Sequence, residues 1–204
     1  MPAVPSTPEE RLMRLRELSV FFCFLAAFSP YAVFAGPAGS GQEAPVMRTI
    51  EKTVTVDAAV AEVWRAWTTV AGVETFFAPE ARLALELEGA YEMLFDLEAK
   101  PGSQGSEGCK VLSWLPERML SFSWNAPTHF PELRKEHTFV VVLLQPLGEK
   151  QTKVSIIHQG WKPGEQWDQL FAYFERAWDI VLGRLAHRFS KGPIDWSAPF
   201  TPGR

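Results

Sequence analysis

Apolar and polar side chains alternate or recur with different periods along the chain after residue 47. Residues 49–56 alternate between the two kinds, which predicts a β-strand with one buried face. Residues 58–68 instead repeat apolar side chains at three- and four-residue steps, which predicts an α-helix. Residues 73–77 predict a short second helical turn that ends before Pro79.

A run of strand-like segments follows. Gly89, residues 101–108 and Pro116 interrupt this run and favour turns. The short link at residues 148–150 predicts an antiparallel hairpin between the last two strands. The six predicted strands are residues 82–88, 90–97, 109–115, 119–124, 135–145 and 153–159.

The longest regular pattern covers residues 165–190. Its apolar side chains recur at helical spacing over about seven turns, while Asp168, Glu175, Arg176 and Arg184 fall largely on the other face. Gly164 precedes the pattern and Gly192-Pro193 follows it, which predicts where the helix begins and ends. The apolar stripe consists of Trp167, Leu170, Phe171, Phe174, Ala177, Trp178, Val181, Leu182 and Leu185.

The order of these elements indicates an α+β fold. One strand, two short helices, a run of strands and one long helix are typical of an antiparallel sheet rather than βαβ units. We expect a curved sheet with the long C-terminal helix across its concave face. Space between the helix and the sheet is where a ligand would bind.

The N-terminal region has the three parts of a signal peptide. Three arginines within residues 11–16 precede an uninterrupted apolar run at residues 18–28. Val33 and Ala35 are small residues that suit the −3 and −1 positions of a cleavage site before Gly36. The sequence therefore predicts an exported protein, periplasmic or secreted.

These features divide the chain into four parts. The predicted parts are a signal peptide at 1–35, a flexible linker at 36–46, the folded domain at 47–191 and an irregular tail at 192–204. An uncleaved anchor is the alternative, but the apolar run is shorter than the roughly 20 residues that span a bilayer. A start at Met13 instead of Met1 would give a more compact signal.

Composition narrows the chemistry that the domain can perform. The formal net charge is −4 with both signs interspersed, which gives no electrostatic footprint for nucleic acid or anionic membrane. Cys23 lies in the predicted signal peptide, so Cys109 alone remains, without an internal disulfide or a zinc cluster. The four histidines do not have metal-ligand spacing, and the sequence contains no phosphate loop or dinucleotide fingerprint. We therefore predict no metal and no cofactor.

Three segments in order resemble a known superfamily. They are IEKTV at residues 50–54, V-W-x-A-W-T at 63–68, and HQGW at 158–161 before the long helix. Together they look like the SRPBCC/START-like superfamily, in its AHSA1-like branch, which is named for the C-terminal domain of the activator of Hsp90 ATPase. The resemblance covers about residues 48–189, with Phe76-Phe77 where the family commonly has Trp-Phe. It implies a helix-grip fold with an apolar cavity, but it does not imply one activity.

Five side chains are the candidates for lining such a cavity: Phe95, Trp124, His158, Phe174 and Trp178. Trp and Phe suit cavity walls, although each would be equally at home in a packed core. His158 follows Val154 and Ile156 at alternate positions, so we expect it to point inward beneath the long helix. We interpret it as a core histidine that hydrogen-bonds its neighbours. The alternative is a polar anchor or acid–base group for a ligand, and no residue is assigned a catalytic role.

Three functions are consistent with this pattern. The first is an exported module that binds a small apolar molecule. The second is an enzyme of the cyclase or hydrolase kind that uses His158 in the same cavity. The third is a co-chaperone of an Hsp90-type ATPase, which an exported protein would not meet.

Overall fold

The computed structural model describes residues 48–200 of the chain. The predicted signal peptide, the predicted cleavage between Ala35 and Gly36, and the predicted linker all lie outside these described residues. Within residues 48–200, no helix is both long and apolar enough to cross a membrane.

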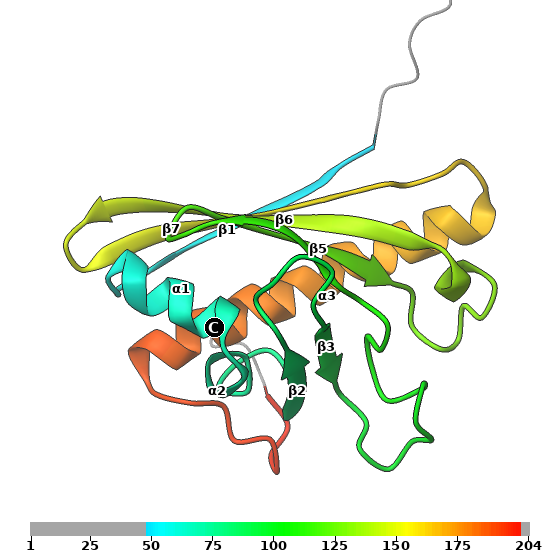
Figure 1. Ribbon diagram of the computed structural model, residues 1–204, viewed down its shortest axis with the longest axis horizontal. Helices are drawn as coiled ribbons and strands as arrows, with labels where there is room; N and C mark the ends of the chain where they lie inside the picture. Colours follow the sequence, from blue (N-terminus) through cyan, green and yellow to red (C-terminus); the bar gives the residue numbers. More distant parts are fainter. Residues whose placement is uncertain (1–47, 201–204) are drawn as a thin grey trace, which may run out of the picture. The chain divides into compact units, whose positions relative to one another are not determined.

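The main layer of the domain is a curved, five-stranded antiparallel sheet (Figure 1). The first strand lies at one edge beside the last, so the order across the sheet is β1-β7-β6-β5-β4. Figure 1 shows the long helix α3 and the short helices α1 and α2 on the same side of this sheet. The strands are β1 (Ile50–Val56), β4 (Val111–Leu115), β5 (Met119–Asn125), β6 (His137–Gly148) and β7 (Gln151–Gln159).

Helices α1 and α3 follow the predicted pattern, whereas α2 ends at Val73, where the second helical turn was predicted to begin. Helix α1 covers Val60–Thr68, α2 covers Val70–Val73 and α3 covers Glu165–Ser190, while Leu133–Lys135 form the short 3-10 helix η2. Helix α3 begins and ends where the apolar period and the flanking glycines predicted. The α+β helix-grip fold expected from the sequence is therefore confirmed.

Alternation along the central hairpin creates the buried face of the sheet. In β7, Thr152, Val154, Ile156 and His158 are buried while the side chains between them are more exposed. The antiparallel register places Val140 of β6 opposite His158, and the neighbouring buried pairs continue the row. The apolar stripe of α3 packs on this row and completes the core.

The strand predicted at residues 82–88 is confirmed only at residues 82–83 and was wrong for residues 84–88. Strand β2 covers only Glu80–Leu83 and pairs with β3 (Tyr91–Leu94), and the two form a separate two-stranded sheet. Backbone hydrogen bonds from Glu86 to Ala84 and from Gly89 to Glu86 make a turn instead, with Glu88 at a φ of 60°. The alternating leucines imitated a strand, but Leu87 is 69% exposed.

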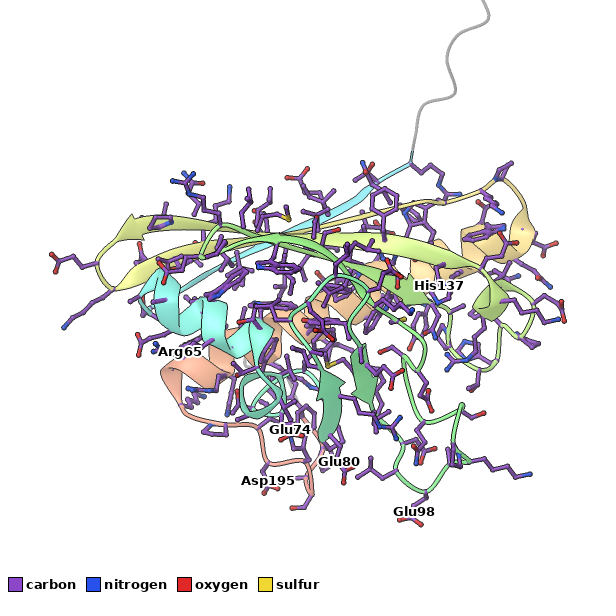
Figure 2. The ribbon with its side chains drawn as sticks, in the orientation of Figure 1. Arg65, Glu74, Glu80, Glu98, His137 and Asp195 are labelled. Carbon is purple, nitrogen blue, oxygen red and sulfur yellow. The ribbon has the colours of Figure 1, made fainter. Side chains whose placement is uncertain are left out.

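The predicted irregular tail is irregular, and its described part packs on the domain. The backbone N–H of Ile194 donates to the carbonyl of Thr75 at 2.9 Å, and the indole N–H of Trp196 donates to the carbonyl of Glu74 at 2.7 Å. Figure 2 shows Glu74 and Asp195 together on the side of the domain away from the five-stranded sheet. The side chain of Ile194 is buried, so the tail contributes to the core.

Candidate functional site

A pocket of about 410 Å³ opens between helix α3, the end of β5 and the loop that follows β3. Pockets of this size accommodate small organic molecules. On α3 the lining residues run from Tyr173 to Arg184. Between these two residues, α3 also contributes Phe174, Ala177, Trp178, Ile180 and Val181. The rest of the lining lies outside α3 and consists of Phe77, Phe95, Asp96, Ser103, Gln104, Gly105, Ser106, Trp124, Asn125, Ala126, Pro127, Thr128 and Arg134.

Three aromatic rings form the inner wall of this pocket. The ring centroid of Phe77 lies 5.6 Å from that of Trp124 and 6.0 Å from that of Trp178. The centroids of Trp124 and Trp178 are 5.8 Å apart. These separations are typical of packed aromatic pairs, so the wall is a continuous apolar surface with fixed geometry.

Large apolar side chains also reach the solvent at the pocket. Phe95, which follows β3, is 45% exposed, and Ile180 on α3 is 42% exposed. Both belong to the lining. Exposed apolar surface beside an apolar cavity is a common feature of ligand sites, because a ligand would cover it.

His158 lies behind the wall rather than in it. Its side chain is completely buried and is absent from the pocket lining. The indole N–H of Trp178 donates to Nδ1 of His158 at 3.0 Å, and Nε2 lies 2.7 Å from Oγ1 of Thr138. The hydroxyl of Thr138 donates in turn to the carbonyl of Trp124 at 2.9 Å.

The donors and acceptors in this series of hydrogen bonds fix the tautomer of His158. An indole nitrogen only donates, so Nδ1 must accept and the proton must reside on Nε2, where it is donated to Thr138. Burial lowers the pKa of His158 from its ordinary value to about 3, so the imidazole is neutral. His158 thus links α3, β7, β6 and β5 as a neutral structural group.

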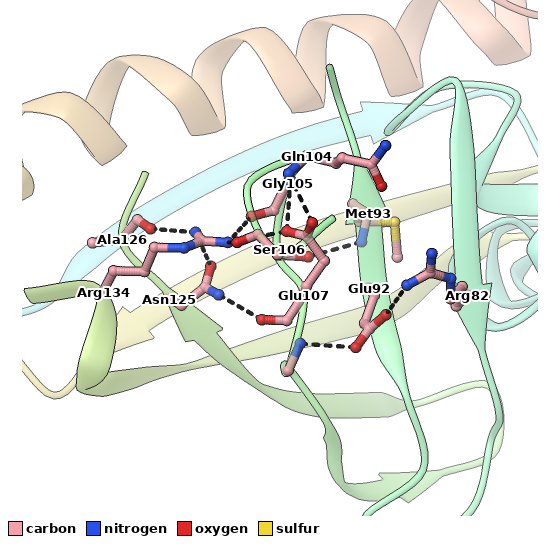
Figure 3. Close-up of polar contacts among 12 residues, drawn as sticks. Arg82, Glu92, Met93, Gln104, Gly105, Ser106, Glu107, Asn125, Ala126 and Arg134 are labelled. Atoms are coloured by element: carbon pink, nitrogen blue, oxygen red, sulfur yellow. Dashed lines mark hydrogen bonds and ion pairs between the residues drawn. The ribbon is translucent and has the colours of Figure 1, made fainter. Parts of the chain in front are cut away.

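Arg134 organises the loop that forms the other side of the pocket (Figure 3). Its guanidinium donates to the side chain of Asn125 and the carbonyl of Ala126, both at the end of β5. It also donates to the carbonyls of Gly102 and Gly105. A 3.0 Å ion pair with Glu107 completes the set, so both terminal nitrogens of Arg134 are engaged by protein acceptors.

Glu107 closes the same network from within the loop. Its two carboxylate oxygens accept from the backbone N–H groups of Gln104 and Gly105 at 2.7 and 2.8 Å. Burial alone would raise the pKa of Glu107, but these N–H groups and the Arg134 charge lower it overall. A charged Glu107 therefore holds the loop in its folded form.

Cys109 is the one cysteine of the described residues. Its side chain is completely buried beside this network, and burial raises the pKa of the thiol to about 12. Within residues 48–200, no group of three or more His, Cys, Asp or Glu side chains could hold a metal ion.

The structure brings four of the five predicted site residues together. Phe95, Trp124, Phe174 and Trp178 all line the pocket, whereas His158 supports it from behind. The sequence analysis missed Phe77 and Arg134, because nothing in the local pattern shows which core or loop residues converge in space. It also placed Arg184 on the outer face of α3, but this side chain lines the pocket. The spacing Tyr173–Ala177–Ile180–Arg184 was the signal that could have revealed it.

Solved structures with the same fold are distant in sequence. Protein MLL2253 from Mesorhizobium loti has a TM-score of 0.58 at 16% identity, covering 72% of this chain and 100% of that one. The Aha1 dimer from Colwellia psychrerythraea has a TM-score of 0.54 at 18% identity, covering 72% of this chain and 98% of that one. CalU16 from Micromonospora echinospora has a TM-score of 0.51 at 22% identity, with coverages of 73% and 78%.

The family assignment comes from the sequence of the domain itself. No curated protein gives a significant match to this chain. The family described as Activator of Hsp90 ATPase homolog 1-like protein matches residues 57–190, which span both short helices, every strand after β1 and the whole of α3. The chain therefore belongs to this AHSA1-like branch of the SRPBCC superfamily.

Proposed function

We propose that the domain binds a small, mainly apolar molecule in the pocket beside α3. The observation that carries the proposal is the combination of an aromatic inner wall with exposed apolar side chains at the same pocket. The indole N–H of Trp178 is already taken by His158 and is not available to a ligand. Burial of apolar ligand surface would then supply most of the binding free energy.

The proposal is tested by titration with N-phenyl-1-naphthylamine, an uncharged dye that fluoresces when it is buried. We expect saturable binding to the wild-type domain. Ile180→Glu should weaken the affinity by about tenfold or more, because it places a charge against the apolar ligand. Leu115→Glu is the matched control, since Leu115 is 54% exposed and is not part of the pocket lining.

Two outcomes would count against the proposal. Absence of dye binding would mean that the pocket is not a binding site for apolar molecules. Equal loss of affinity in the Ile180 and Leu115 variants would mean that the dye binds elsewhere on the surface.

The cyclase or hydrolase alternative depends on His158. Both ring nitrogens of His158 hold protein partners, and its side chain is excluded from the pocket lining. A general acid or base must reach the proton that it transfers. The geometry therefore supports binding better than catalysis by this residue.

We also propose that the domain acts outside the cytoplasm after cleavage behind Ala35. The support is the order of basic, apolar and small-residue segments at the N-terminus. Intact-mass measurement of the protein from its own host should give a mature chain that starts at Gly36. A mass that retains the N-terminal segment would overturn this proposal and would restore the co-chaperone hypothesis.

A further inference from the structure

The pocket contains one cationic side chain that its protein neighbours do not satisfy. Arg184 lines the pocket and forms no ion pair with any carboxylate of the described residues. Its Nε atom is buried and has no hydrogen-bond partner. The two terminal nitrogens of Arg134, the other cation of the lining, already donate to five protein acceptors.

The position of Arg184 is fixed by the C-terminal tail. Its guanidinium carbon lies 4.9 Å from the ring centroid of Trp196 and 5.5 Å from that of Phe200. Trp196 is itself anchored to Glu74 by its indole N–H. Aromatic faces attract the cation but leave its N–H groups free to donate to another acceptor.

The two ends of the lining on α3 differ in chemistry. Tyr173 and Arg184 are three helical turns apart, which corresponds to about 16 Å along the helix axis. The α3 residues between them in the lining are apolar. A molecule lying along this stripe would meet apolar surface over most of its length and a guanidinium at one end.

The balance of charge at Arg184 also indicates an anion. Burial lowers the pKa of Arg184, because its charged form is poorly compensated. Asp96, the one carboxylate in the lining, accepts from the backbone N–H of Glu98 and does not pair with Arg184. A carboxylate matches the planar fork of a guanidinium, because its two oxygens can accept two parallel N–H bonds.

We propose that the ligand is an amphipathic carboxylate whose apolar body lies along α3 and whose carboxylate binds Arg184. This inference rests on the proposed function, because it assumes that the pocket binds an apolar molecule. It assigns to Arg184 the selection between acids and uncharged molecules of the same shape.

The test compares 1-naphthaleneacetate with 1-naphthaleneacetamide as competitors of bound N-phenyl-1-naphthylamine. The two molecules share one shape and differ in charge. For the wild-type domain we expect the acid to displace the dye at a concentration about tenfold lower than the amide. Arg184→Gln should abolish this preference, measured as the ratio of the two displacing concentrations within the variant itself.

Two further variants separate charge at the pocket from other effects. Arg184→Lys keeps the charge and should keep part of the preference for the acid. Arg176→Gln removes the same charge from an exposed position of α3 and should leave the preference unchanged. Thermal unfolding of each variant establishes that it is folded.

The outcomes distinguish this inference from the proposed function. Dye binding with equal displacement by acid and amide would overturn the inference and leave the proposed function standing. A preference for the acid that persists in Arg184→Gln would overturn the assignment to Arg184. Failure of the dye to bind the wild-type domain would overturn both.

Discussion

At the scale of the residue, His158 shows how a polar group can be built into an apolar core. Its two ring nitrogens meet one donor and one acceptor, so neither is left unpaired. The alternation of β7 predicted that His158 would point inward. Its partners were not predictable, because Thr138 and Trp178 lie 20 residues away on either side along the chain. Arg184 was missed for a related reason, since a charged residue beside a helical stripe looks solvent-facing in sequence.

Neutral burial of His158 should make stability depend on pH. Because the folded-state pKa is about 3 and the unfolded value is about 6.5, only the unfolded state gains a proton between these values. Stability should therefore fall as the pH falls through this window. Urea unfolding should give about 2 kcal/mol less stability at pH 5 than at pH 7 from this residue. His158→Gln should lack this component, and an identical pH dependence in the variant would contradict the assignment.

Thr138 relays the hydrogen bonds from His158 to the backbone of β5. Thr138→Val keeps the shape but leaves Nε2 of His158 without its acceptor, so we expect a loss of about 1–3 kcal/mol in the free energy of unfolding. Thr55→Val changes the same chemical group on the exposed face of β1 and should shift stability by less than about 0.5 kcal/mol. Equal effects in the two variants would show that the hydrogen bonds from His158 through Thr138 to β5 do not stabilise the fold.

At the scale of the element, the local spacing of apolar residues was enough to predict a helix or strand where one face of that element is buried. The period of α3 and the alternation of β6 and β7 predicted these elements well, because burial of one face dictates the sequence pattern. The leucines at residues 83–87 have the same alternation, but β2 ends at Leu83 and Leu87 is exposed, so there the prediction was wrong. The loop after β3 has no periodic signal, since its conformation depends on Arg134, which comes later in the chain.

Arg134 should therefore control the order of that loop. Arg134→Met removes the charge that pairs with Glu107, whose side chain is only 11% exposed, and it leaves several carbonyls without a donor. We expect a loss of about 2–4 kcal/mol and faster amide exchange in residues 96–108. Arg118→Met, at an exposed position before β5, should change neither quantity. Unchanged exchange in the Arg134 variant would show that the loop is held by other contacts.

At the scale of the whole molecule, the residues after α3 close the side of the domain remote from the sheet (Figure 1). The proline content of this segment correctly indicated irregular backbone. The packing of Ile194 and Trp196 against the core was not predictable from the sequence, because single apolar residues between prolines carry no periodic signal.

Removal of this segment tests its contribution. A chain that ends at Lys191 loses the buried Ile194 and both hydrogen bonds to the turn after α2. We expect about 2–4 kcal/mol lower stability by chemical denaturation. A chain that ends at Phe200 retains every described contact and is the control. Equal stability of the two truncated chains would show that the packing of the tail is not stabilising.

The buried thiol of Cys109 bears on the compartments in which the domain can fold. With its pKa raised to about 12, Cys109 is neither a ready nucleophile nor a partner for a disulfide. The described residues thus contain no disulfide bond, and their fold does not require an oxidising environment to form one. A fold without a disulfide can form in either a reducing or an oxidising compartment, so the folded core of residues 48–200 is compatible with both.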